Sequence, residues 1–131
     1  MRALLILAVV GLLVAACGAE PAPSATPDPV QGVALLTQPP PGPNFACQDA
    51  LAGGTLAADP RSGLGLRTES GVMPVSWPFG FAAARADGVL VLIDDAGRAL
   101  ARAGDPLSVP GGMGANGLWF ACPPITVGQP R

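Results

Sequence analysis

The chain has 131 residues, 12% of them charged, with a formal net charge of −2, and its length is enough for one small domain. Its seven basic residues are all arginine and are scattered along the chain, which disfavours a nucleic-acid partner. Lysine, histidine and tyrosine are absent, so Ser-His-Asp, Cys-His and Ser-Lys nucleophiles and histidine-based zinc sites are excluded.

Residues 1–16 have the features of a secretory signal peptide. Arg2 supplies a positive end, residues 3–14 form an apolar run, and two alanines precede Cys17. The uncharged run is shorter than the ~20 residues that a transmembrane helix needs, which favours cleavage over a retained anchor. We therefore expect a mature chain that begins at Cys17.

Val14-Ala15-Ala16-Cys17 resembles the lipobox of bacterial lipoproteins, in which an aliphatic residue and two small residues precede a cysteine. The resemblance implies cleavage before Cys17, a diacylglyceryl group on its sulfur, and acylation of the new amino terminus, for instance with palmitate. Several acyl chains hold a protein on a bilayer more firmly than one myristoyl chain does. The alternative is an ordinary signal peptide followed by a chance cysteine. The prediction is a lipid-anchored protein on the extracytoplasmic face of the cell membrane.

Residues 17–44 are predicted to form a lipidated, proline-rich, disordered tether, because eight of the sixteen prolines lie there. Proline lacks a backbone N–H and fixes φ, which blocks both helices and sheet ladders. The expected role is a spacer between bilayer and domain, and the alternative for Pro39–Pro43 is a docking motif for a partner. The apolar patch Val33–Leu36 is either an early strand on the domain or an isolated sticky segment.

Residues 45–126 are predicted to form one small β-rich domain, followed by a tail over residues 127–131. Glycines divide this region into short runs, which is typical of an all-β sandwich or barrel. Val89–Ile93 is the clearest strand, and Asp94–Gly97 favours a turn into a returning strand over Arg98–Ala103. We expect a mainly β fold, a small antiparallel barrel or sandwich that is OB-like or SH3-like.

Two segments of this domain carry conflicting signals. Phe81–Ala86 and Arg98–Ala103 consist of good helix formers, so local propensity favours helices. Each is too short between its glycines to hold a helix without tertiary support. Alternation in the second would put Ala99, Ala101 and Ala103 on one face, which suits a narrow barrel. We favour strands for both segments.

Cys47 and Cys122 lie near the two ends of the predicted domain. With Cys17 lipidated they are a remaining pair in an oxidising compartment, where such a pair usually forms a disulfide. A bridge around a loop of this length stabilises a fold by roughly 4 kcal/mol on the loop-entropy estimate. The alternative is two free structural thiols.

Trp77, Phe79 and Phe81 would share one face if this segment were a strand. We expect them in the core of the domain, and the alternative is an exposed aromatic platform for a glycan or a small ligand. Pro78 indicates that such a strand lies at a sheet edge or begins after residue 78.

Four aspartates gather around the predicted hairpin: Asp87, Asp94, Asp95 and Asp105. Paired carboxylates can hydrolyse glycosides and carboxylate oxygens can bind calcium. Their spacing matches no calcium loop, and aspartates at turns accept backbone hydrogen bonds. We therefore predict turn residues here, with no catalytic residue, no metal ligand and no cofactor.

Trp77-Pro78-Phe79-Gly80-Phe81, the run Gly88–Leu92, Asp95–Asp105 and then Gly111-Gly112 are together similar to a pattern in small bacterial lipoproteins. The resemblance implies a small OB-like or SH3-like barrel of uncharacterised role. It carries no catalytic residues that transfer to this chain.

The sequence as a whole predicts a membrane-anchored extracytoplasmic lipoprotein with a non-enzymatic binding or accessory role in the cell envelope. Its candidate partners are the membrane, through the lipid at Cys17, and an envelope protein, but no nucleic acid. The alternative is a domain that binds a glycan or a small ligand through the face from Trp77 to Phe81. A hydrolase that works through carboxylates alone ranks third.

Overall fold

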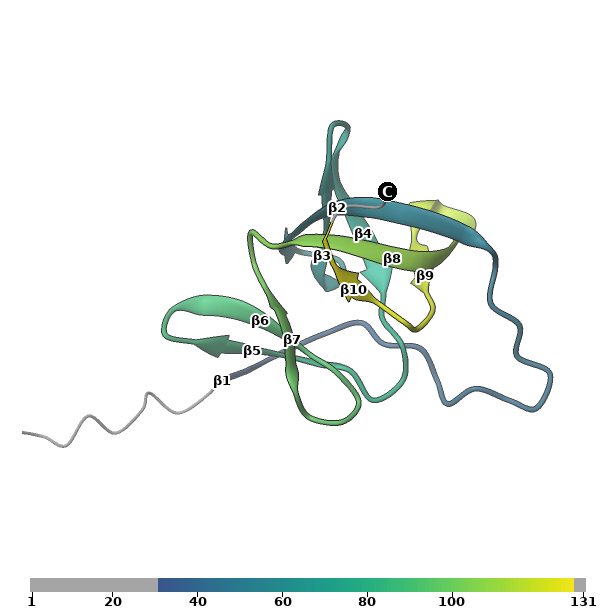
Figure 1. The fold of residues 1–131 in the computed structure, drawn as a ribbon, viewed down its shortest axis with the longest axis horizontal. Helices are drawn as coiled ribbons and strands as arrows, with labels where there is room; N and C mark the ends of the chain where they lie inside the picture. Colours follow the sequence, from purple (N-terminus) through teal and green to yellow (C-terminus); the bar gives the residue numbers. More distant parts are fainter. Residues whose placement is uncertain (1–30, 129–131) are drawn as a thin grey trace, which may run out of the picture.

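Strands make up almost all regular structure in residues 31–128, which a computed structural model describes (Figure 1). The predicted signal peptide, Cys17 and the first half of the predicted tether, up to residue 30, lie outside these residues. Among the described residues, no helix is long and apolar enough to cross a membrane. The elements are β1 (Gln31–Val33), β2 (Ala50–Asp59), β3 (Gly63–Thr68), β4 (Gly71–Ser76), β5 (Ala82–Ala86), β6 (Val89–Ile93), β7 (Ala99–Arg102), β8 (Pro106–Met113), the 3-10 helix η1 (Ala115–Gly117), β9 (Trp119–Ala121) and β10 (Thr126–Val127).

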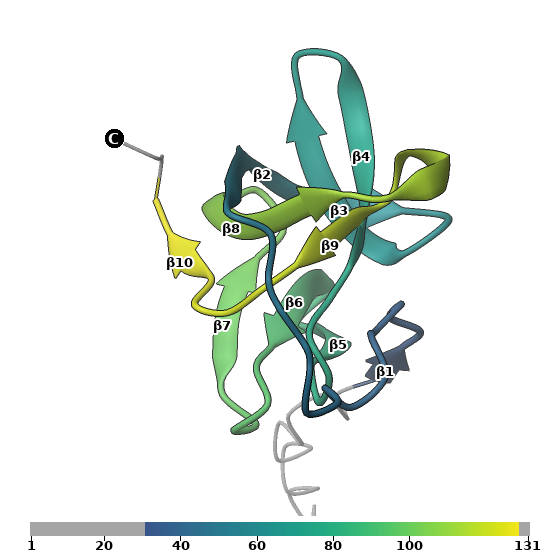
Figure 2. The ribbon, with the colours of Figure 1, turned by 90° about the vertical axis from the view of Figure 1, so that its right-hand side faces the viewer.

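Five strands close into a barrel in the order β2-β3-β4-β9-β8, with β8 pairing back onto β2. Every pair is antiparallel except β4 and β9, in which Val75 lies opposite Trp119. A ring with an odd number of strands cannot alternate in direction throughout, so one parallel pair is unavoidable. Figure 2 shows β9 and β10 following one another along β8, and β10 pairs through Thr126 and Ser108. The predicted mainly β fold with a small barrel is confirmed.

The second sheet is antiparallel, has the order β1-β5-β6-β7 and lies below the barrel in Figure 1. Asp87 and Gly88, at φ values of 50° and 75°, connect β5 to β6. A two-residue connection with positive φ at both positions matches the twist of a hairpin. Both alanine-rich segments with conflicting signals are strands, as predicted. Each pairs with β6, whereas a helix of six residues would have had no comparable tertiary support.

Strand β7 differs from the predicted alternation of alanines. Ala101 is buried, but Ala99 is exposed and Ala103 only half-buried. The pairing of β6 with β7 shifts register between Leu92 and Ile93. This irregularity interrupts the strict two-residue period on which the prediction depends.

Residues 31–38 are part of the folded domain, ahead of the boundary that the sequence predicts between residues 44 and 45. Val33 pairs with Ala83 of β5, and the backbone of Leu36 donates a hydrogen bond to the carbonyl of Ser62 and accepts one from the N–H of Trp77. Val33 and Leu35 also pack against the hydrophobic core. The apolar patch inside the predicted tether therefore lies on the domain: Val33 ends strand β1, and the residues after it are held by backbone hydrogen bonds and apolar contacts.

One hydrophobic core is shared by the barrel and the second sheet. Trp77 is 0% exposed, and its indole Nε1–H donates a 2.8 Å hydrogen bond to the carbonyl oxygen of Leu64. Leu92 and Ala101 bring the second sheet into the same core. The other fully buried apolar side chains come from the barrel: Leu56, Leu64, Leu66, Val75, Leu107 and Val109. The two sheets therefore form one folded unit.

The predicted disulfide is present between Cys47 and Cys122, which are 75 positions apart in the sequence and 6.0 Å apart between Cα atoms. Cys47 precedes β2 and Cys122 follows β9, so the bond joins the entry of the barrel to its last closing strand. Free thiols at these two positions are thereby excluded for this structure.

Candidate ligand-binding cleft

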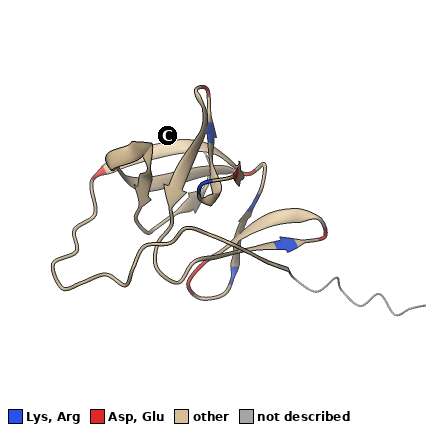
Figure 3. Cartoon of the chain, turned by 180° about the vertical axis from the view of Figure 1, so that it is seen from behind, with Lys and Arg blue, Asp and Glu red and all other residues tan. Residues whose placement is uncertain are grey.

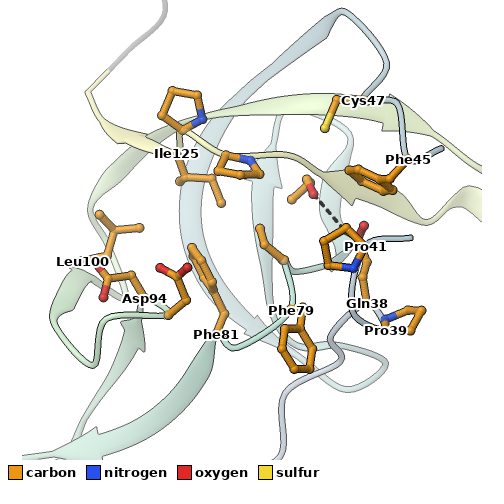
Figure 4. Close-up of a pocket in the computed structure, with 15 residues that line it drawn as sticks. Gln38, Pro39, Pro41, Phe45, Cys47, Phe79, Phe81, Asp94, Leu100 and Ile125 are labelled. Atoms are coloured by element: carbon orange, nitrogen blue, oxygen red, sulfur yellow. Dashed lines mark hydrogen bonds between the residues drawn. The ribbon is translucent and has the colours of Figure 1, made fainter. Parts of the chain in front are cut away.

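A cleft of about 510 Å³ opens between the barrel, the second sheet and the loop over residues 39–49 (Figure 4). This volume lies within the ~300–1,000 Å³ of typical small-molecule sites. Its lining consists mostly of proline, phenylalanine and aliphatic side chains. The lining residues are Gln38, Pro39, Pro41, Phe45, Cys47, Pro78, Phe79, Phe81, Asp94, Asp95, Leu100, Ala121, Pro123, Pro124 and Ile125.

A tight turn over residues 78–81 sets two of the aromatic side chains in the cleft. The N–H of Phe81 donates a 3.2 Å hydrogen bond to the carbonyl oxygen of Pro78, and Gly80 takes a φ of +87°. A Cβ atom on Gly80 would lie 3.0 Å from the Cβ of Asp95, so the turn packs closely against the β6–β7 connection. Glycine suits both the positive φ and the close approach. Phe79 and Phe81 line the cleft as a result.

The predicted aromatic face is divided by this turn. Trp77 is in the core and does not line the cleft, whereas Phe79 is 54% exposed and Phe81 is half-buried against the core. The three side chains do not share one strand face, because residues 78–81 form a turn, which breaks the alternation of side chains. Trp77 lies in the core and Phe79 on an accessible surface, and a role of these residues as a ligand platform stays a prediction.

Phe45, which is 51% exposed, is the third aromatic residue of the cleft, and the sequence reasoning missed it. It lies in the 39–49 loop, close to the predicted boundary between tether and domain. Its place two residues before Cys47 could have predicted that it lies on the domain, because a disulfide at Cys47 holds the neighbouring residues against the domain. Figure 4 shows Phe45 beside Cys47 at the opposite end of the cleft from Leu100.

Gln38 fixes the start of the loop wall. Its side-chain Nε2 donates hydrogen bonds to the carbonyl oxygens of Ser76, at 2.8 Å, and Ala121, at 2.7 Å. These two carbonyls lie at the ends of β4 and β9, the parallel pair of the barrel. The backbone N–H of Gln38 also donates to the carbonyl of Trp77. The Gln38 side chain thus attaches the start of the loop to the parallel pair β4 and β9, and the loop continues with the lining residues Pro39 and Pro41.

The disulfide fixes the far end of the same wall. Residues 39–49 are all exposed, and among the described residues their hydrogen bonding is internal, from the N–H of Phe45 to the carbonyl of Gly42. Cys47 is covalently joined to Cys122, which is followed by the lining residues Pro123 and Pro124. The disulfide therefore holds two walls of the cleft at a set separation.

The polar side chains of the cleft are Gln38, Asp94 and Asp95, and none of the arginines in residues 31–128 lines it. Asp94 Oδ1 accepts hydrogen bonds from the backbone N–H groups of Ala96, at 3.0 Å, and Arg98, at 2.9 Å. This is the turn role predicted for Asp94. Figure 3 shows the acidic positions at turns, and no group of three or more metal-ligating side chains occurs among the described residues.

In comparisons with known proteins, no family model matches the chain, and no curated protein or solved structure matches it significantly. The resemblance of residues 77–112 to small bacterial lipoproteins thus rests on the quoted residues alone. The barrel, the second sheet and the cleft are the observations on which a function has to be based.

Proposed function

We propose that this chain is a lipid-anchored, extracytoplasmic binding protein that holds an apolar small molecule in the cleft between its barrel and its second sheet. The observation that carries the proposal is the set of three phenylalanines, Phe45, Phe79 and Phe81, around a cleft of ligand size. Two of them keep about half of their surface exposed. A ligand that covers this exposed surface gains ~25 cal/mol of binding free energy for each Å² of apolar surface removed from water.

Two of the three polar side chains of the cleft are already engaged, which supports an apolar ligand over a glycan. Sugar hydroxyls need free donors and acceptors beside the aromatic rings. Gln38 already uses its Nε2 on two backbone carbonyls, and Asp94 Oδ1 already accepts from two backbone N–H groups. Glycoside hydrolysis needs two carboxylates in separate roles, so the engagement of Asp94 in its turn also supports a non-enzymatic role.

Phe79→Ala is expected to weaken binding of the neutral probe naphthylethanol by about tenfold or more, because part of the apolar lining is lost. Its fold should persist, since the Phe79 side chain is 54% exposed. Isothermal titration calorimetry of the full chain measures the change. Phe120→Ala is the matched control, because Phe120 is 40% exposed but does not line the cleft. Equal affinities in the native protein and Phe79→Ala would refute this site.

The anchor is part of the same proposal and is supported by Val14-Ala15-Ala16-Cys17. Cys17→Ser is expected to leave an uncleaved precursor or to release the protein from the membrane, because serine has no thiol to accept the lipid. Cell fractionation with measurement of the molecular mass of the mature chain distinguishes these results. A processed Cys17→Ser protein that stays on the membrane would contradict lipidation.

An accessory role beside an envelope protein is a prediction for the same anchored domain. Crosslinking in intact cells followed by mass spectrometry is expected to capture a recurrent protein neighbour. Capture should depend on Cys17, because the lipid sets where the domain resides. An absence of any neighbour in intact cells would count against the accessory role and leave the binding role in place.

A further inference from the structure

We propose that the ligand of this cleft is a small apolar molecule with one positively charged group, which lies at Asp95 and Asp94 while the apolar part contacts the phenylalanines. This inference rests on the proposed binding function and specifies the chemical class of its ligand. It comes from the unequal distribution of charge and apolar surface along the cleft.

The two carboxylates lie at one end of the cleft. Figure 4 shows Asp94 beside Leu100 and Phe81, away from Phe45 and Pro41 at the other end. Asp94 and Asp95 are adjacent in the β6–β7 connection, so both come from the same turn. A bound molecule therefore meets apolar side chains along most of its length and negative charge at one end.

The protein leaves this charge only partly compensated. Arg98 is the cation paired with Asp94, but its Nε is 3.6 Å from Asp94 Oδ2, and its side chain is 80% exposed. Among the described residues, the Asp95 carboxylate takes part in no hydrogen bond or ion pair. One exposed arginine cannot neutralise two carboxylates, so the described residues around this end of the cleft keep a net negative charge.

The position of Asp95 connects this charge to the aromatic lining. Its Cβ lies 3.0 Å from the position that a Cβ on Gly80 would take, beside the turn that carries Phe79 and Phe81. A carboxylate beside apolar surface loses favourable hydration when a ligand covers it, unless the ligand supplies a partner. A cationic group provides that partner through a charge-assisted hydrogen bond, whereas a carboxylate on the ligand would be repelled.

The size of the cleft favours a small molecule over a protein segment as the occupant. A volume of about 510 Å³ lies within the range of small-molecule sites, about 300–1,000 Å³. The chemical class is therefore an aryl or alkyl amine, which is protonated at neutral pH.

Three probes of matched size test the proposal: naphthylethylammonium, naphthylethanol and naphthylacetate. Isothermal titration calorimetry of the full chain is expected to give the tightest binding for the ammonium, by roughly tenfold over the alcohol, and the weakest for the acetate. The preference for the ammonium over the alcohol should decrease as salt is added, because part of the site is solvent-accessible.

Variants locate the origin of that preference. Asp95→Asn is expected to reduce the ratio of ammonium to alcohol affinity, and the double variant Asp94→Asn/Asp95→Asn to bring it close to one. Asparagine at position 94 keeps a side-chain oxygen for the backbone N–H groups of Ala96 and Arg98, so the turn is retained. Asp87→Asn is the matched control, since Asp87 lies in the β5–β6 turn and does not line the cleft.

The possible failures separate the two proposals. Equal affinity for the ammonium and the alcohol in the native protein overturns the charge inference and leaves the apolar binding function standing. An unchanged ratio in the double aspartate variant overturns it as well. Absence of binding by all three probes overturns the proposed function itself.

Discussion

Replacing both Cys47 and Cys122 by serine is expected to lower the free energy of unfolding by roughly 4 kcal/mol, because the unfolded chain is no longer constrained by the loop. The disulfide spans 75 positions, which makes the entropic effect large. A domain of this size has only ~5–15 kcal/mol of stability in total, so the loss is a substantial share of it. Urea unfolding of the native and double-serine proteins, compared at equal slope, measures the difference.

The same substitution is expected to weaken naphthylethanol binding by about tenfold or more, because the loop wall loses its covalent attachment. The barrel itself should stay closed, since its ring is formed by backbone pairing of β2, β3, β4, β9 and β8. As a control, a reductant added to the double-serine variant should change neither its unfolding midpoint nor its affinity for naphthylethanol. An unchanged unfolding midpoint together with unchanged affinity would contradict both expectations.

Trp77→Ala is expected to destabilise the domain by about 3–5 kcal/mol, because it empties the centre of a core in which the indole is 0% exposed. The milder Trp77→Phe keeps an aromatic ring but removes the indole N–H. The carbonyl of Leu64 then loses the hydrogen bond from the indole N–H, so we expect a cost of about 1 kcal/mol in addition to any loss of packing. Thermal and urea unfolding followed by circular dichroism give both values.

Phe79→Ala is the comparison for this pair of variants, because its side chain is 54% exposed and contributes little to the core. It should leave the unfolding midpoint near that of the native protein while it weakens ligand binding. If the Trp77→Ala protein kept native stability but lost ligand binding, the result would contradict a core role for Trp77 and support its role in an exposed aromatic platform. The two residues are two positions apart, so the contrast tests directly whether the turn that begins at Pro78 separates a core residue from a cleft residue.

Local sequence signals predicted the β-hairpin of the second sheet well. Val89–Ile93 is apolar and β-branched, and Asp94–Gly97 has the residues that a turn requires. The structure places Asp94 as a hydrogen-bond acceptor in that turn and Gly97 at a φ of +78°. Elements of this kind are predictable because all their determining contacts lie within about ten residues of one another.

The candidate cleft was predicted only in part. Phe79 and Phe81 stood out as aromatic residues in a domain with few of them, but Trp77 was grouped with them by strand alternation. Phe45 was missed because proline content alone placed the preceding segment outside the domain. Each error has the same cause, since the positions of these side chains depend on contacts between segments distant in the sequence.

The secondary-structure class, the β6–β7 turn and a disulfide between the two cysteines of the domain were predictable from residue types. The first two follow from propensity and turn chemistry, which act locally, and the disulfide follows from the cysteine count if Cys17 carries a lipid. The parallel closure of β4 on β9, the docking of residues 31–38 and the cleft itself are evident only in the folded chain. All three arise because distant segments bury apolar surface and satisfy backbone groups together, as Gln38 does between Ser76 and Ala121.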